Sequence, residues 1–336
     1  MSELIIEQKP NRFAEWKGVF MQAVKAREIT LGANLLILCL VMTLLYPEQF
    51  PTMENLSQVL LNISLDSIVA IGMMILMIAG MFDLSVGSVV AFAGGLAGYL
   101  MYYHHVHFAW AIAAALTGSV IIGILNGLLV ARAGINPLIQ TLAMMGIVRG
   151  FAILLSGGGL QNFSYGFIYI GQTKILGLQT PVWYMLSAIC LFAFLMRRTV
   201  FFRRFYYIGG NERAARLSGI PVVKMKIVAL TLSAFLAGFA GILLSSRLGA
   251  ALSTAGTGME LRVITAVILG GASLSGGKGK IWGAFLGAAF MGLMNNMLIL
   301  SRVSGYWQEI ILGIFLILAV GTDQLLKAHS KNINKS

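Results

Sequence analysis

The sequence predicts an all-α, polytopic membrane protein with about ten transmembrane helices. Hydrophobic residues make up 58% of its 336 residues and charged residues only 11%, and the mean hydropathy is +0.85. A soluble globular domain carries about 25% charged residues, so this composition excludes one. The 39 glycines fit a bundle whose helix backbones approach closely.

The net charge of +12 is explained by a membrane rather than by nucleic acid. Cytoplasmic loops of membrane proteins collect Lys and Arg, so we expect contact with membrane lipid and no nucleic-acid partner. The two cysteines, Cys39 and Cys190, both lie in apolar runs, which indicates neither a disulfide framework nor a metal site.

Residues 1–30 are predicted to form a cytoplasmic amphipathic arm. Phe13, Trp16, Phe20 and Val24 recur at helical spacing, with basic residues among and just after them. A helix of this kind lies on the membrane surface. An unstructured basic tail is the alternative interpretation.

The transmembrane domain is predicted to cover residues 31–325. Its ten apolar spans are 31–46, 59–80, 86–103, 108–131, 137–155, 181–196, 222–245, 263–273, 281–300 and 308–325. A helix needs about 20 apolar residues to cross a bilayer, so the short span 263–273 is a candidate for a broken or re-entrant segment. The span 137–155, which carries polar residues, is a second candidate.

The distribution of basic residues predicts that both ends of the chain lie in the cytoplasm. With the N-terminus inside, ten crossings return the C-terminal tail, residues 326–336, to the same side. Nineteen of the 24 Lys and Arg residues then fall inside, which satisfies the positive-inside rule.

The cytoplasmic loop 197–226 contains eight of the basic residues and a short predicted helix. We expect Gly209-Gly210 to form a turn, Asn211 to cap the helix and Gly219 to end it. About two helical turns cannot cross a bilayer, so the helix is expected to dock into a protein partner. The candidate docking residues are Gly209, Gly210, Asn211, Glu212, Arg213, Ala214, Ala215, Arg216, Leu217, Ser218, Gly219, Ile220 and Pro221.

Polar residues among the apolar spans are the candidates for a translocation path. Asp83 and Ser85 interrupt an apolar run between glycines, which indicates either a capped helix break or a discontinuous helix beside the path. Gln140, Thr141 and Arg149 share one apolar span, where helix–helix hydrogen bonding is the alternative to lining a pore. The candidate translocation and gating residues are Asp83, Ser85, Asn126, Asn136, Gln140, Thr141, Arg149, Glu260, Ser273 and Ser275.

Two further motifs are more simply interpreted as loops than as ligand-binding sites. The glycine-rich turn before Lys280 is similar to a phosphate loop, but Gly277 stands where such a loop requires lysine, so we reject nucleotide binding by this chain. His104, His105 and His107 share a loop without a nearby carboxylate or thiol, which favours a polar loop over a metal site. No catalytic arrangement stands out, and we expect no enzyme activity.

Four motifs follow one another between residues 57 and 325. They are DLSVGS at 83–88; NP at 136–137 with TL at 141–142 and RG at 149–150; IGGNE at 208–212 with AARLSGI at 214–220; and the segment 266–279. In this order and spacing they resemble the permease subunits of bacterial ABC importers for monosaccharides, the family of the ribose, xylose and galactose permeases. The resemblance covers nearly the whole chain.

The resemblance implies an inner-membrane permease subunit that imports a monosaccharide. It implies three kinds of partner, namely a second permease subunit in a homo- or heterodimer, a cytoplasmic ABC ATPase pair and a periplasmic sugar-binding protein. ATP and Mg²⁺ would be held by the ATPase, and this chain would hold no cofactor. It also implies that 209–221 is the coupling helix that docks into the ATPase, in agreement with the expectation from the residues themselves.

The chain departs from the family pattern at two places. Met81 and Phe82 follow Gly80 where the family usually has a glycine and an aliphatic residue, and Arg262 stands where it commonly has Asp. The Arg262 departure leaves the particular sugar open. The same machinery with another cargo is an alternative: an autoinducer-like furanose, a sugar alcohol or a branched-chain amino acid. An ATP-independent secondary transporter is a different class, and it would need a coupling-ion site that few acids here support. An intramembrane enzyme is a third.

Overall fold

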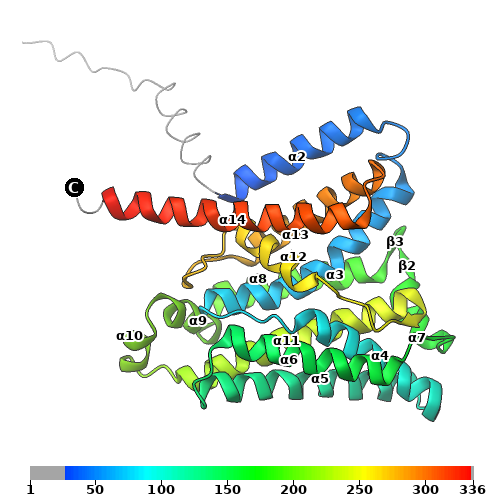
Figure 1. Ribbon diagram of the computed structural model, residues 1–336, viewed down its shortest axis with the longest axis horizontal. Coiled ribbons are helices and arrows are strands. Elements are labelled where there is room, and N and C mark those ends of the chain that lie inside the picture. Colours follow the sequence, from blue (N-terminus) through cyan, green and yellow to red (C-terminus); the bar gives the residue numbers. More distant parts are fainter. Residues whose placement is uncertain (1–26, 334–336) are drawn as a thin grey trace, which may run out of the picture.

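The computed structural model describes residues 27–333, which form a bundle of long helices lying roughly side by side (Figure 1). The predicted amphipathic arm, with Phe13, Trp16, Phe20 and Val24, falls almost entirely within residues 1–26 and so lies outside the described part of the chain. The prediction of an all-α polytopic protein is confirmed.

Eight helices in the described residues are long and apolar enough to cross a membrane, by length and composition. Each coincides with a predicted span. They are α2 (Arg27–Leu45), α3 (Met53–Ile78), α4 (Val86–His104), α5 (Phe108–Ala131), α6 (Pro137–Ser156), α8 (Thr180–Arg198), α11 (Val222–Leu248) and α13 (Ile281–Leu300).

The two remaining predicted spans are also helices, but of different lengths. The helix α12 (Met259–Leu269) has only 11 residues, which rise about 16 Å at 1.5 Å each, well short of a hydrocarbon core of about 30 Å. The helix α14 (Gly305–Ile333) continues beyond the predicted end of the last span. By contrast, α6 is unbroken over 20 residues, with the Asn136 side chain capping it and Pro137 in its first turn.

The bundle is held by close contact between helix backbones, as the glycine content predicts. The central helix α11 packs against α5, α4 and α3. Gly123 and Gly127 of α5 face α11 so closely that a Cβ on either would lie 2.6 Å from Thr231 Cα or 2.7 Å from Ile227 Cα, respectively. Small residues therefore set the distance between these helices.

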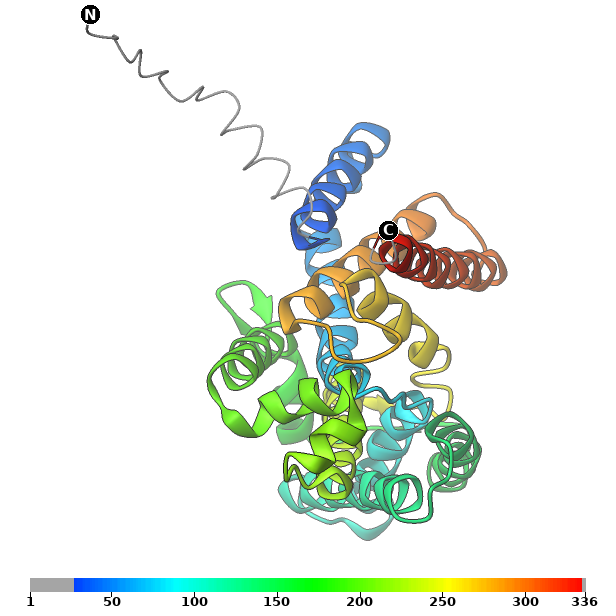
Figure 2. The same cartoon turned by 90° about the vertical axis from the view of Figure 1, so that its left-hand side faces the viewer.

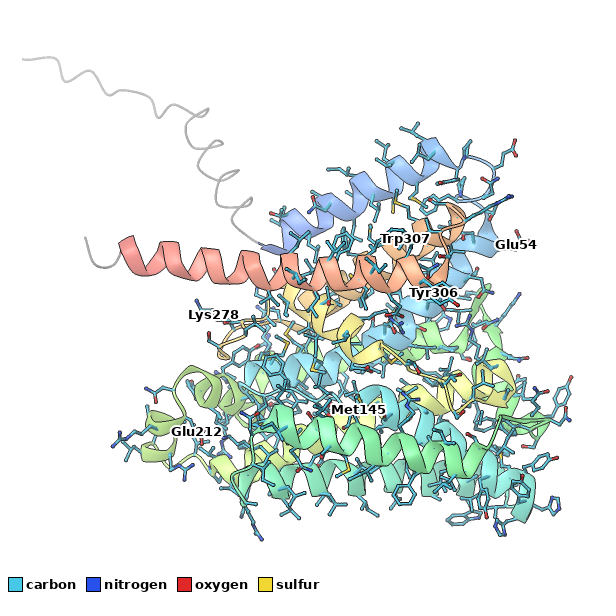
Figure 3. All side chains as sticks on the ribbon, in the orientation of Figure 1. Glu54, Met145, Glu212, Lys278, Tyr306 and Trp307 are labelled. Atoms are coloured by element: carbon cyan, nitrogen blue, oxygen red, sulfur yellow. The ribbon has the colours of Figure 1, made fainter. Side chains whose placement is uncertain are left out.

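The segments predicted to be cytoplasmic gather at one end of the molecule. The start of α2, the far end of α14, α9 (Val200–Gly210) and α10 (Glu212–Leu217) all lie at the left in Figure 1, and Figure 2 looks onto this end. Figure 3 places Glu212 and Lys278 there and Glu54, Tyr306 and Trp307 at the opposite end. We call the first of these the α10 end.

The opposite end carries small elements that the sequence did not predict. They are α7 (Tyr165–Gln172) and two antiparallel ladders, which pair β1 (Leu160–Gln161) with β4 (Ala250–Ala251) and β2 (Lys174–Ile175) with β3 (Leu178–Gln179). Strands of two residues leave no periodicity to detect.

The three histidines lie where α4 gives way to α5: His104 is the last residue of α4, and His105 and His107 lie in the connection. His105 ends α4 with a left-handed φ of 52°, and the Nδ1 atom of His107 caps α5 by accepting a hydrogen bond from the Ala109 amide at 3.3 Å. Residues 27–333 contain no group of three side chains suited to hold a metal ion.

Three glycine-bearing segments meet at the α10 end. They are Gly80 after α3, Gly209 at the end of α9, and Gly276-Gly277 in the loop 270–280 before α13; we call this contact the glycine junction. The Gly277 amide donates a hydrogen bond to the Ile78 carbonyl at 2.8 Å.

The expectation that Gly209-Gly210 forms a turn is wrong, because both residues are the last residues of α9. The helix persists through them, and the Asn211 amide bonds to the Tyr207 carbonyl at 3.0 Å. A Cβ on Gly209 would overlap the carbonyl oxygen of Ile78. Gly209 is therefore required for close approach and not for chain reversal.

Replacing Gly209 tests the glycine junction. Gly209→Ala forces the end of α9 away from Ile78, and overpacking of this kind costs about 1–3 kcal/mol. We expect the purified protein to melt several degrees lower than wild type. The matched control is Gly210→Ala, because a Cβ at that exposed residue meets nothing within 4 Å. Equal melting temperatures for the two variants would contradict the packing role of Gly209.

Candidate functional site

The helix α10 begins and ends as its sequence predicts. The Asn211 side chain accepts a hydrogen bond from the Ala214 amide at 3.0 Å, which satisfies one of the free N–H groups of the first turn. Gly219 adopts a left-handed φ of 79°, and the Ile220 amide bonds back to the Ala215 carbonyl at 3.1 Å. This is the glycine-ended helix terminus that stops a helix sharply.

Glu212 fastens α10 to the bundle. Its carboxylate accepts a hydrogen bond from Lys226 Nζ at 2.7 Å and another from Arg216 Nη2 at 3.1 Å. The hydrogen bond from Lys226 contributes most to lowering the pKa of the Glu212 carboxyl below its usual value. The carboxylate is therefore charged at neutral pH and ties α10 to the first turns of α11.

Most of the thirteen predicted docking residues face away from the bundle. Only Ala215 is buried, and Gly209, Glu212 and Ile220 are partly buried. Leu217 is 84% exposed although its side chain is apolar. The exposed members of the set are Gly210, Asn211, Arg213, Ala214, Arg216, Leu217, Ser218, Gly219 and Pro221. An apolar side chain beside exposed arginines at a helix tip is suited to a protein partner.

Five of the predicted translocation residues form one buried group beneath this end. Ser85 Oγ donates a hydrogen bond to Asp83 Oδ1 at 2.5 Å, Asn126 Nδ2 to Ser85 Oγ at 3.2 Å, and Gln140 Nε2 to Asn126 Oδ1 at 3.3 Å. Thr141 Oγ1 accepts from the Leu84 amide at 3.1 Å. We call these residues, Asp83, Ser85, Asn126, Gln140 and Thr141, the polar cluster; all are buried.

The polar cluster explains the helix break between α3 and α4. No solvent is available in a membrane to satisfy backbone groups, so the break needs internal partners. The Ser85 amide donates a hydrogen bond to Asp83 Oδ1 at 2.8 Å, and the Leu84 amide donates one to Thr141 Oγ1. The expectation that Asp83 or Ser85 caps the next helix holds for position only, because Ser85 is the N-cap residue of α4 and its side chain makes no capping bond.

Several buried polar atoms around the cluster have no hydrogen-bond partner among the described residues. They include Asp83 Oδ2 and the hydroxyl of Ser88. The Ser233 hydroxyl lies near the Asp83 carboxylate but does not reach it with the geometry of a full hydrogen bond. A buried polar group without a hydrogen-bond partner costs free energy, and packing between helices does not require such a group. Ser88 and Ser233 were missed as candidates because a serine in a small-residue helix carries no distinctive pattern.

Arg149 and Glu260 belong to a second group. Arg149 Nη1 donates hydrogen bonds to the carbonyls of Ser253 at 2.7 Å and Ala255 at 2.8 Å. Glu260, at the start of α12, interacts electrostatically with the guanidinium. Arg149 therefore faces protein, and it joins α6 to the segment that leads into α12.

The remaining three candidates lie elsewhere. Asn136 is exposed and caps α6 by accepting from the Leu138 amide at 2.9 Å. Ser273 is buried and Ser275 exposed in the loop 270–280, where Ser273 Oγ accepts from the Ser275 amide at 3.3 Å. Both serines belong to the glycine-rich loop and not to the polar cluster.

Arg262, the residue that departs from the family pattern, has a partner within the chain. Its Nε atom lies 3.8 Å from Asp66 Oδ2 of α3. Both side chains are largely shielded from solvent, so the pair neutralises two charges that would be unfavourable alone. Sequence reasoning missed this pair, as it missed Lys226, because the partners lie on different helices far apart in the chain.

Comparison with known proteins adds a further finding. Residues 55–320 match the family described as "Branched-chain amino acid transport system / permease component". The chain is 40% identical over 294 residues to the ribose import permease protein of Escherichia coli (strain K12), covering 86% of this chain and 91% of that protein. It is 38% identical over 290 residues to the L-arabinose ABC transporter permease protein of Azospirillum brasilense, covering 86% and 85%. The ribose import permease protein of Bacillus subtilis (strain 168) is 37% identical over 296 residues, covering 87% and 91%.

Arg149 provides a test of the second group. Arg149→Ala removes both bonds to the 253–255 carbonyls, and hydrogen bonds to charged groups contribute about 1.5–3 kcal/mol each. We expect solute uptake by reconstituted vesicles to fall at least tenfold. Arg149→Lys, which keeps the charge but replaces the planar guanidinium by an ammonium, should give an intermediate rate, and Arg132→Ala, at an exposed residue, should match wild type. Wild-type uptake by Arg149→Ala would leave Arg149 as a packing residue.

Proposed function

Since the chain belongs to the branched-chain amino acid transport system / permease component family, and its relatives include ribose and L-arabinose permeases, we propose that it carries a sugar across the membrane while α10 docks into a separate ATPase. The chain is a multi-pass inner-membrane permease subunit of an ABC sugar importer. It is not itself an enzyme, and ATP is hydrolysed on a separate subunit. An ATPase and a binding protein are its partners in general.

The exposed position of α10 is the observation that supports the coupling role. Leu217 presents an apolar side chain at the α10 end, and a protein surface would remove it from water. The opposite side of α10 is fixed by Glu212 to Lys226 of α11. Closure of an ATPase pair around ATP would displace α10, and α9 and α11 would pass the displacement to the bundle as a rigid-body movement.

The finer composition of the importer is part of the same proposal. Two permease subunits, identical or different, would enclose the path, and a periplasmic sugar-binding protein would deliver the cargo at the end opposite α10. ATP and Mg²⁺ would be bound by the ATPase alone. This arrangement agrees with the absence of a lysine at Gly277, where a phosphate loop would require one.

The proposed cargo is a monosaccharide of five-carbon size. Relatives with 34–40% identity are named as permeases for ribose or L-arabinose, which are both five-carbon sugars. The family description names branched-chain amino acids instead, and these are the second candidate. Both cargoes are small and polar, so the two proposals are separated by comparing how a sugar and an amino acid each stimulate the importer.

The coupling role of α10 is tested by removing its exposed apolar contact. Leu217→Asp should lower co-purification of the ATPase at least tenfold and abolish sugar-stimulated ATPase activity, because a carboxylate is unfavourable in a buried interface. The matched control is Leu176→Asp, which alters an equally exposed leucine (86%) at the opposite end. Glu212→Arg, which repels Lys226, should also abolish uptake while the protein stays in the membrane. Normal ATPase retention and uptake in both variants would remove the coupling role.

The cargo is tested in the complete importer with its binding protein. We expect ribose or L-arabinose to raise ATPase activity several-fold and leucine to leave it at the basal rate. Stimulation by leucine and not by either sugar would assign the amino-acid cargo instead. Uptake driven by an ion gradient without the ATPase would contradict the ABC mechanism altogether.

A further inference from the structure

A groove of about 870 Å³ opens at the α10 end between α8, α9 and the start of α13. Its wall on α8 continues from the last turn, at Arg197 and Arg198, back to Cys190. The eight steps from Cys190 to Arg198 correspond to about 12 Å along the helix. The groove therefore begins at the membrane boundary and extends into the depth at which α8 crosses the bilayer.

The mouth of the groove is strongly basic. Arg197, Arg198 and Arg203 line it and are all exposed. No carboxylate in the described part of the chain forms an ion pair with any of the three. The fourth cation, Lys280, is already paired, because its Nζ lies 2.8 Å from Glu28 Oε1. Three guanidinium groups are thus available to one anionic group.

The inner part of the groove is apolar and aromatic. Phe194 is 61% exposed and Trp282 is 50% exposed, and Tyr207 lies beside the arginines. Tryptophan and tyrosine at the end of a membrane span are placed where a headgroup meets its acyl chains. A ligand that fits this groove has an anionic head and an apolar tail.

We propose that this groove binds one acidic phospholipid from the leaflet on the α10 side of the membrane. Its phosphate would lie among Arg197, Arg198 and Arg203, and an acyl chain would run along Phe194 and Trp282. Basic pockets between transmembrane helices recognise anionic headgroups in this way. The inference is independent of the cargo and of the docking role of α10.

Two other occupants fit the groove less well. A soluble ATPase can reach the arginines but not the part of the groove that lies within the bilayer beside Phe194. The arm formed by residues 1–30 has five basic and four acidic residues, so it brings no net negative charge to the arginines.

A bound lipid would brace elements that carry α10. Tyr206 of α9 donates a hydrogen bond from its hydroxyl to the Gly279 carbonyl at 2.8 Å, beside the groove. This bond joins α9 to the segment that begins α13. A phospholipid held by Arg203 on one wall and Trp282 on the other would add a second link between the same two elements.

The experiment uses the complete importer, purified and examined by native mass spectrometry with added phosphatidylglycerol or phosphatidylcholine. Wild type should retain one phosphatidylglycerol in preference to phosphatidylcholine. The triple variant Arg197→Gln, Arg198→Gln, Arg203→Gln should retain at least fivefold less. The matched control, Arg132→Gln, Lys174→Gln, Arg302→Gln, removes three exposed charges elsewhere and should retain lipid like wild type.

A second measurement does not depend on the arginine variants. In nanodiscs, brominated phosphatidylglycerol should quench wild-type tryptophan fluorescence more than that of Trp282→Phe, because bromine on the acyl chain lies beside Trp282. Equal retention of the two lipids by wild type, or unchanged retention by the triple variant, would overturn the proposal. Loss of the ATPase from the triple variant with phosphatidylglycerol retained would assign the groove to the ATPase instead.

Discussion

Direct contact between backbones at the glycine junction is the constraint on which the α10 end of the molecule depends. Gly209 brings the end of α9 against the Ile78 carbonyl, and Gly277 bonds to that same carbonyl. Three segments far apart in the chain are thus held in direct contact, and a single residue, Asn211, separates α9 from α10. Under the proposed coupling role, a displacement of α10 would reach α3, which is the most deeply buried of the eight candidate spans.

The polar cluster joins the helix break after α3 to two neighbouring helices. Asp83 and Thr141 satisfy the backbone amides that the break after α3 leaves free, and Asn126 and Gln140 extend the hydrogen bonds to α5 and α6. A hydrogen-bonded chain between three helices fixes their relative positions more narrowly than apolar packing does, because its bonds depend on direction. The break and its two neighbouring helices are therefore held as one hydrogen-bonded unit.

The sequence was sufficient for features that depend on local chemistry. The spans, the cap at Asn211 and the helix end at Gly219 follow from hydropathy and side-chain type within a few residues. The misread pair Gly209-Gly210 shows the limit, because glycine serves both turns and close packing, and only the neighbouring helix decides between them. The same holds for the candidate site: its polar residues could be named, but their grouping could not. The division into the polar cluster, the Arg149 group and the loop 270–280 depends on contacts between distant helices.

The pair formed by Arg262 and Asp66 has a consequence for exchanging parts between related permeases. One partner lies on α12 and the other on α3, 3.8 Å apart and largely shielded from solvent. A chimera that takes α12 from a relative with an acid in place of Arg262 would place two carboxylates side by side. A chimera that takes α3 from a relative without Asp66 would leave the Arg262 guanidinium without its carboxylate partner. The two helices have to be transplanted as a matched set, so the natural unit of recombination in this bundle is a charge-balanced helix pair and not a contiguous stretch of sequence.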